Sequence, residues 1–321
     1  MKKLFMMLAV LTLFIGCAPA NQASENEAEQ LVEEEINGQE AVEAEGLKII
    51  SPQGAPALTL IPIVNDGKNE VVTVEGADAI TAELSKPTPE YDVIIAPTNL
   101  GVKLASTGNS SYKLLAVVDW GNLYIVGSDE TALDEGHELA AFGENAVPGL
   151  VFNKAYSDVK ANVTFYNDVS DAREMLLSQN ADAALLAEPA ATATIAAAKK
   201  NGMELKVISN VQEKWGDEGF PMAALFVNSK TYEANKSMYE DLLTKMDEYA
   251  DAVSEDTAAQ VVSDIESKGA EFYGVPNAEI IGKSYQRINI DITKASECKD
   301  QIAQFLEIFN VTDIDDALIT E

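Results

Sequence analysis

The residues best able to carry out chemistry are scarce in this chain of 321 residues, which contains one histidine and two cysteines. A structural zinc site needs four cysteine or histidine ligands, whereas Cys17, His137 and Cys298 supply only three. A nucleophilic triad would have to use His137, which lies in the acidic stretch 134–138, a pattern typical of a solvated loop. The many carboxylates leave calcium or magnesium binding open, but they lack the spacing of an EF-hand loop. We therefore expect no catalytic residue, no metal centre and no cofactor.

The charge balance excludes several classes of partner. The formal net charge is -31, from 53 acidic and 22 basic residues. Such a field repels phosphate backbones and anionic bilayers, so we do not expect a nucleic acid as a partner. Arg173 and Arg287 are the two arginines of the chain, too few for an anion site built from a cluster of guanidinium groups. An anion could still be held at helix N-termini.

Four turns place polar, small or proline residues directly after apolar runs that are typical of strands. The residues in these turns that could contact a ligand are Ser51, Gln53, Gly54, Thr98, Asn99, Glu144, Asn145 and Glu188. Ligands of open parallel sheets bind beyond the carboxyl ends of the strands, where helix N-termini converge. Helix capping alone also explains each turn taken singly. Four such turns in two halves favour one shared cleft, in which Gly54 offers a bare backbone N–H and the second half closes over the ligand.

Four side chains, of which only Glu188 lies in one of these turns, have more specific candidate roles. Trp120, next to Gly121, could stack on a ring or alkyl group of a ligand, or it could simply cover the sheet edge. Asn122 could fix the orientation of the ligand. Glu188 follows an apolar strand, so it could meet a cationic ligand or cap its own helix. Arg287 could neutralise Glu188, meet a ligand carboxylate or form a surface salt bridge.

The elements that must position these residues alternate between short β-rich runs and helical patterns. Alternation of this kind predicts an α/β fold with mainly parallel sheets flanked by helices. We expect a first lobe of residues 46–128 and 222–321 and a second lobe of residues 129–221, with the helices after Ser229 on the first lobe. The strands are expected at 47–50, 71–74, 91–96, 112–118, 122–126, 138–142, 163–166, 183–187 and 222–227.

The N-terminus has the features of an export signal followed by a tether. Lys2 and Lys3 precede an apolar run too short to span a bilayer comfortably, which predicts a signal peptide over residues 1–16. The segment 14–17, ending in Cys17, resembles a bacterial lipobox and implies acylation of Cys17; the alternative is an ordinary signal with an incidental cysteine. Residues 17–45 are acidic and predict an unfolded tether. Cys298 would then be unpaired, on a helix face with Ile302 and Phe305, as a buried thiol.

The order and spacing of several motifs resemble the periplasmic-binding-protein fold of nitrate-, sulfonate- and thiamine-precursor-binding proteins. The motifs are Gly54-Ala55-Pro56-Ala57, residues 91–99, residues 120–124, Phe142-Gly143-Glu144 and residues 182–190. The resemblance covers most of residues 46–310. It implies a type II two-lobed receptor, monomeric and held outside the cytoplasm by its acyl anchor, which captures a small solute for the permease and ATPase of an ABC importer.

The resemblance leaves the solute and two other functions open. An aromatic or amine-bearing solute, such as a thiamine precursor, suits Trp120 and Glu188 better than a sulfonate or nitrate, because the chain supplies few cations. A surface lipoprotein used for sensing or adhesion is one alternative. An enzyme on the same fold is another, but the enzymes that share this architecture depend on cysteine and histidine residues. We expect a binding protein without catalytic activity.

Overall fold

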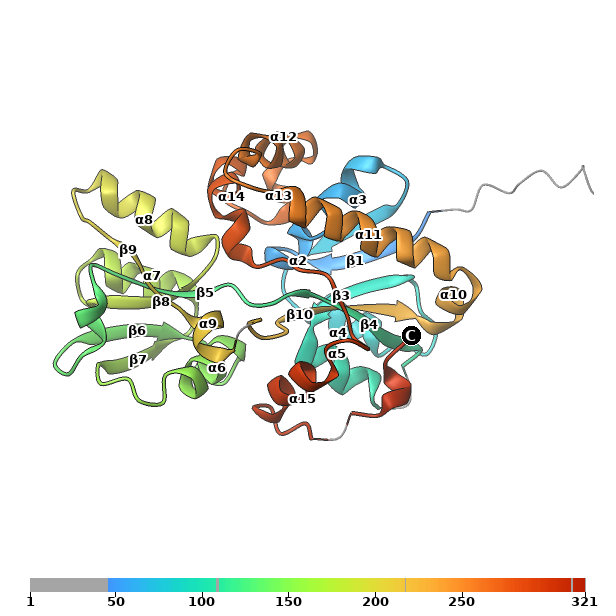
Figure 1. Cartoon of the computed structure of the whole chain (residues 1–321), viewed down its shortest axis with the longest axis horizontal. Helices are drawn as coiled ribbons and strands as arrows, with labels where there is room; N and C mark the ends of the chain where they lie inside the picture. The colour runs from blue at the N-terminus through green and yellow to red at the C-terminus, as the bar shows by residue number, and fades with distance from the viewer. Residues whose placement is uncertain (1–45, 108–109, 217, 313, 321) are drawn as a thin grey trace, which may run out of the picture. The chain divides into compact units, whose positions relative to one another are not determined.

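The computed structural model describes residues 46–107, 110–216, 218–312 and 314–320 (Figure 1). The predicted signal peptide, the predicted lipidation site Cys17 and the acidic tether lie outside these residues and stay predictions. Within the described ranges, no helix is both long enough and apolar enough to span a bilayer.

The first lobe is built on a six-stranded sheet with the order β11-β4-β10-β3-β1-β2. Strand β1 pairs in parallel with β2 and β3, whereas β10 runs antiparallel to both β3 and β4. Strands β1 to β4 therefore share one direction, and their carboxyl ends lie at one edge of the sheet. The bounds are β1 (Lys48–Pro52), β2 (Glu70–Val74), β3 (Val93–Pro97), β4 (Tyr112–Asp119), β10 (Ala223–Asn228) and β11 (Thr293–Lys294).

The second lobe is built on a five-stranded sheet with the order β7-β6-β8-β5-β9. Strands β6, β7 and β8 are parallel, and β5 runs antiparallel to its neighbours β8 and β9. Each lobe thus has a mainly parallel sheet into which a crossing strand is inserted in the opposite direction. The bounds are β5 (Leu123–Gly127), β6 (Glu138–Phe142), β7 (Asn162–Tyr166), β8 (Ala183–Ala187) and β9 (Lys206–Asn210).

Helices cover both faces of each sheet because every strand near the centre is apolar on both sides. In the first lobe α4 and α5 pack on one face, and α3, α10 and α11 pack on the other. The long helix α11 buries Tyr239, Leu242, Leu243 and Met246, a spacing that places all four on one helical stripe. The bounds are α2 (Ala55–Leu58), α3 (Ile61–Asp66), α4 (Asp78–Leu84), α5 (Thr98–Ala105), α10 (Ser229–Ala234), α11 (Lys236–Ala252), α12 (Ala258–Lys268), α13 (Ala270–Tyr273), α14 (Ala278–Ser284), η2 (Tyr285–Ile288), α15 (Lys299–Glu307) and η3 (Asp316–Leu318).

In the second lobe α7 and α8 cover one face of the sheet, and α6 covers the other. Asp168 precedes helix α7, and its carboxylate accepts the backbone N–H groups of Ser170 and Asp171 and so caps the first turn. The bounds are η1 (Glu130–Leu133), α6 (Val147–Ala155), α7 (Val169–Leu177), α8 (Ala190–Lys200) and α9 (Val211–Trp215). The α/β fold with two lobes and helix-flanked sheets, predicted from the sequence, is confirmed.

The chain passes between the two sheets twice, from β4 to β5 and from α9 to β10 (Figure 1). The return of β10 to the first sheet agrees with the expected second crossing. The first crossing comes earlier than the expected boundary after residue 128, because β5 pairs with β8 and β9 of the second sheet. The boundary expected in the loop around residue 128 is therefore wrong, and the crossing consists of Trp120, Gly121 and Asn122.

The C-terminal helix α15 confirms the expected setting of the second cysteine. Cys298 directly precedes this helix and is buried, in one core cluster with Ile302, Phe305 and Leu306. Phe305 stacks on Phe220 of the second crossing at 5.9 Å between ring centroids. Burial raises the pKa of the Cys298 thiol to about 12, which keeps it protonated and unreactive at neutral pH.

Candidate functional site

The carboxyl ends of the strands in the two sheets meet at the first crossing. In the first sheet Asp119 pairs with Ala223, which pairs with Pro97, so the end of β4 lies at the same edge as Thr98. In the second sheet Leu123 pairs with Ala187, and the Glu188 N–H donates to the carbonyl of Asn122 at 2.9 Å. Because only three residues separate β4 from β5, the two strand-end edges adjoin each other there.

The polar groups after β1 are occupied by the protein itself. The Ser51 hydroxyl is fully buried and donates to the carbonyl of Pro52 at 3.0 Å, and the Gln53 amide donates to the carbonyl of Glu271 at 3.0 Å. The Gly54 N–H donates to the carbonyl of Tyr273 at 2.8 Å. The expectation that Gly54 offers a bare N–H is therefore wrong, because carbonyl groups of α13 contact this turn.

Four predicted side chains at the strand ends hold buried polar atoms without a partner among the described residues. Thr98 is fully buried, and Trp120 and Asn122 are each 2% exposed. The unpartnered atoms are Thr98 Oγ1, Asn99 Oδ1, Trp120 Nε1 and Asn122 Oδ1. A buried donor or acceptor without a hydrogen bond costs about 1–3 kcal/mol, and proteins leave few of them. Such a concentration at one edge is typical of a place where another molecule supplies the missing partners.

Asp119, which was not among the residues predicted from the sequence, ends the apolar strand β4 in the same place. Its side chain is fully buried; Oδ1 accepts the Gly121 N–H at 2.8 Å, and Oδ2 has no partner among the described residues. Burial raises the pKa of Asp119 to about 7, and the Gly121 hydrogen bond opposes this only in part. A carboxylate closing an otherwise apolar run, Leu114–Val118, is the signal that could have drawn attention to it.

This pKa makes stability depend on pH in a predictable direction. Because the pKa of Asp119 is about 7 in the folded protein and 3.8 without burial, the folded state binds the proton more tightly. Stability should therefore fall as pH rises through that window, by roughly 2–4 kcal/mol. Asp119→Asn keeps the acceptor for Gly121 and should remove this loss, which urea unfolding at pH 5 and pH 7.5 would measure. Parallel pH profiles for the variant and the wild type would contradict the raised pKa.

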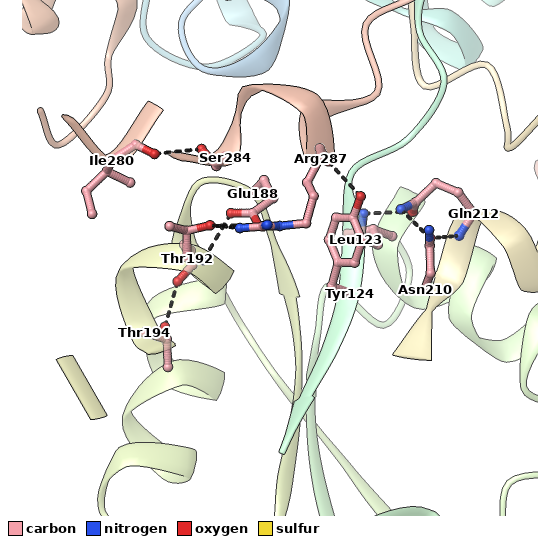
Figure 2. A network of polar contacts seen from close by, with 11 residues as sticks. Leu123, Tyr124, Glu188, Thr192, Thr194, Asn210, Gln212, Ile280, Ser284 and Arg287 are labelled. Carbon is pink, nitrogen blue, oxygen red and sulfur yellow. Dashed lines mark hydrogen bonds and ion pairs between the residues drawn. The ribbon is translucent and has the colours of Figure 1, made fainter. Parts of the chain in front are cut away.

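Glu188 and Arg287 form an ion pair between the two lobes (Figure 2). The Arg287 Nε donates to Glu188 Oε1 at 2.7 Å, and the guanidinium also donates to the Thr192 hydroxyl. The Thr192 hydroxyl and N–H donate to the two oxygens of Glu188 at 2.9 and 3.0 Å. Glu188 thus caps the first turn of α8 and is neutralised by Arg287. The capping role expected for Glu188 and the neutralising role expected for Arg287 therefore occur together. It is not the unpaired carboxylate that a cationic ligand would need.

Glu144, Asn145 and His137 lie away from this network. Glu144 and Asn145 are exposed in the turn between β6 and α6, so their expected role in closing over a ligand stays a prediction. His137 is in the loop before β6, half-exposed, with Nδ1 3.3 Å from Asp182 Oδ2, which agrees with the expected loop.

A cavity of about 860 Å³ lies on the side of the crossings where β9 and β11 form the sheet edges. Trp120 and Arg287 are the two predicted residues that line it. Its other side chains include four carboxylates that the sequence analysis missed, Glu213, Glu218, Asp291 and Glu297. In the described part of the chain, no group of three or more His, Cys, Asp and Glu side chains is arranged to hold a metal ion.

Comparisons with known proteins identify the architecture. No family model matches the chain, and no curated protein sequence matches it either. An ABC transporter structure from Parabacteroides distasonis is 20% identical with a TM-score of 0.70, covering 86% of this chain and 99% of that chain. The periplasmic aliphatic sulphonate binding protein SsuA from Escherichia coli is 15% identical with a TM-score of 0.61, over 86% and 92% of the two chains. The periplasmic nitrate-binding protein NrtA from Synechocystis is 13% identical with a TM-score of 0.57, over 86% and 83%.

These similarities show the fold. The chain has the two-lobed periplasmic-binding-protein fold over the range that the sequence motifs indicated. At this level of identity the fold says nothing of the ligand.

Proposed function

We propose that this protein is the extracytoplasmic solute-binding receptor of an ABC importer. It would capture a small organic solute between its lobes and deliver it to a permease driven by an ATPase. The similar structures include binding proteins for a sulphonate and for nitrate, and an ABC transporter component, which supports this class. The sequence of residues 1–17 supports export and anchoring through Cys17.

The observation that carries the proposal is the set of unpartnered polar atoms where the two strand-end edges adjoin. Thr98 and Asn99 follow β3 of the first lobe, and Asn122 precedes β5 of the second. A solute bound between them would satisfy groups of both lobes at once, so it would bind the closed arrangement better than an open one. That difference in affinity is what a binding protein needs to report capture to a permease.

The chemistry of these atoms favours a solute that carries N–H groups. Asn99 Oδ1, Asn122 Oδ1 and Asp119 Oδ2 accept hydrogen bonds, whereas of the unpartnered atoms at this edge only Trp120 Nε1 and the Thr98 hydroxyl could donate to a ligand. A sulfonate or nitrate needs several donors and a cation. Arg287 is already paired with Glu188, so it is poorly placed to neutralise an anion. Trp120, which is 2% exposed here, would add a flat apolar face to such a site. We therefore propose an aromatic or amine-bearing solute, now on the basis of acceptors rather than of Glu188.

A thermal-shift panel tests both the receptor function and the proposed class of solute. The probes are 4-aminopyrimidine, benzylamine, ethanesulfonate and nitrate, each at 1 mM. A dissociation constant near 10 μM would raise Tm by roughly 5 °C or more. A shift with an amine and no chemical conversion of it is the expected result. A shift with ethanesulfonate alone would refute the solute class and keep the receptor. Turnover of a probe would contradict the receptor, and so would uptake by cells that is unaffected by Trp120→Ala.

A further inference from the structure

The two crossings join the lobes covalently. A third segment contacts both lobes through hydrogen bonds and an ion pair. This segment, Ser284–Asn289, belongs to the first lobe because Tyr285 and Ile288 are buried in one cluster with residues of α2 and α12. Asn289 fixes it to the first crossing: its carbonyl accepts the Trp120 N–H, and its side-chain amide donates to the Trp120 carbonyl, both at 3.0 Å.

The same segment holds the second lobe through a main-chain and a side-chain contact. The Tyr124 hydroxyl, on β5, donates to the carbonyl of Arg287 at 2.8 Å, and the Arg287 side chain reaches Glu188 and Thr192 at the start of α8 (Figure 2). Residues of α14 and α8 also approach each other here. The segment is therefore tied to both the crossing and the second lobe.

Opening the lobes at this point would break a buried ion pair. The Glu188 side chain has no exposed surface, and within the described ranges Arg287 is the cation paired with it. Breaking the pair costs free energy, because Glu188 loses the charge-assisted hydrogen bond that Arg287 donates. Arg287 itself is 39% exposed and would be rehydrated. The pair thus favours the arrangement in which the lobes are held together.

The pair also lies next to the proposed solute contacts. The Glu188 N–H donates to the carbonyl of Asn122, one of the residues with an unpartnered side-chain oxygen. A change in the position of Glu188 relative to the first lobe therefore changes the position of the strand ends that would contact a solute.

We propose that Arg287 is a positioning residue for solute capture: through Glu188 and Tyr124 it holds the two lobes in the binding-competent arrangement. This rests on the proposed receptor function, but the lobe contact itself is independent of any solute. An arrangement that is already populated raises the apparent affinity, since less free energy is needed to reach it.

The test measures the distance between the lobes in the full chain, without solute. Dyes are placed on Lys103→Cys and Lys199→Cys, exposed positions on α5 and α8, in a Cys17→Ser background; Cys298 is 1% exposed. Single-molecule energy transfer is compared for the parent protein, Arg287→Met, Arg287→Lys and Tyr124→Phe. Tyr124→Phe removes only one hydroxyl, so it remains informative where Arg287→Met fails to fold. The control is Lys245→Met, which removes an ion pair of 3.0 Å to Asp66 within the first lobe.

We expect Arg287→Met and Tyr124→Phe to shift the population to lower transfer, Arg287→Lys to restore part of it, and Lys245→Met to leave it unchanged. The dissociation constant of benzylamine should rise about tenfold in Arg287→Met. Unchanged transfer, an equal shift in Lys245→Met, or lobe opening with an unaltered dissociation constant would each overturn the proposal. A shift in transfer in a protein that binds none of the four panel probes would keep the lobe contact and count against the receptor function and the positioning role.

Discussion

Gly219→Ala should lower the free energy of unfolding by about 3 kcal/mol, a loss near the top of the range for a single strained position. Gly219 lies in the second crossing with φ of 85°, and a Cβ there would lie 2.3 Å from the carbonyl oxygen of Trp120. That oxygen cannot move aside, because it accepts hydrogen bonds from Phe220 N–H and the Asn289 side chain. Urea unfolding measures the change.

Gly216→Ala is the matched control in the same segment. Gly216 has an extended φ of 177°, and a Cβ there would meet no atom within 4 Å. The free energy of unfolding of the Gly216→Ala variant should differ from that of the parent protein by less than about 0.5 kcal/mol. Similar values for the two variants would mean that the close approach of the crossings does not support the fold.

The double substitution Thr98→Val and Asn122→Leu should separate binding from stability. It removes two buried polar atoms that have no partner in the described structure, at nearly constant volume. The free energy of unfolding should stay the same or rise by roughly 1 kcal/mol, because no intramolecular hydrogen bond is lost from those atoms. Solute affinity should fall by about a hundredfold, close to 2.7 kcal/mol, as measured by titration calorimetry with the amine that binds best in the panel.

Thr231→Val is the control, and it should lower stability without changing affinity. The Thr231 hydroxyl is 2.7 Å from the hydroxyl of Tyr239, in a satisfied contact on the far helices of the first lobe. Its loss should cost about 1 kcal/mol of stability and leave affinity unchanged. If the double substitution destabilises the protein and leaves affinity intact, Thr98 and Asn122 are structural residues and the proposed binding edge is wrong.

Local pattern was sufficient for the central strands and the fold. The runs predicted at 138–142 and 183–187 coincide with β6 and β8, because a strand buried on both faces is a continuous apolar run. The edge strand β9, Lys206–Asn210, was missed, since it is mostly half-exposed and its composition is largely polar. Strand β11 has only two residues, too few to leave a pattern.

The site was harder to predict because its contacts join distant parts of the chain. Glu188 and Arg287 are 99 positions apart, and their pairing was one of three possibilities for Arg287. The occupied N–H of Gly54 depends on Tyr273, which no turn pattern near Gly54 reveals. Asp119 ends an apolar run, but its full burial is seen only in the structure.

The two crossings restrict the mechanics of the molecule. Phe220 and Met222 donate their N–H groups to the carbonyls of Trp120 and Asp119, so the crossings form a single two-stranded ribbon. Sliding one lobe past the other would shear this ribbon, whereas flexing about an axis along it keeps both hydrogen bonds. Lobe motion is then reduced to one soft rotational coordinate, and microsecond-to-millisecond relaxation with a single dominant exchange process is the expected signature.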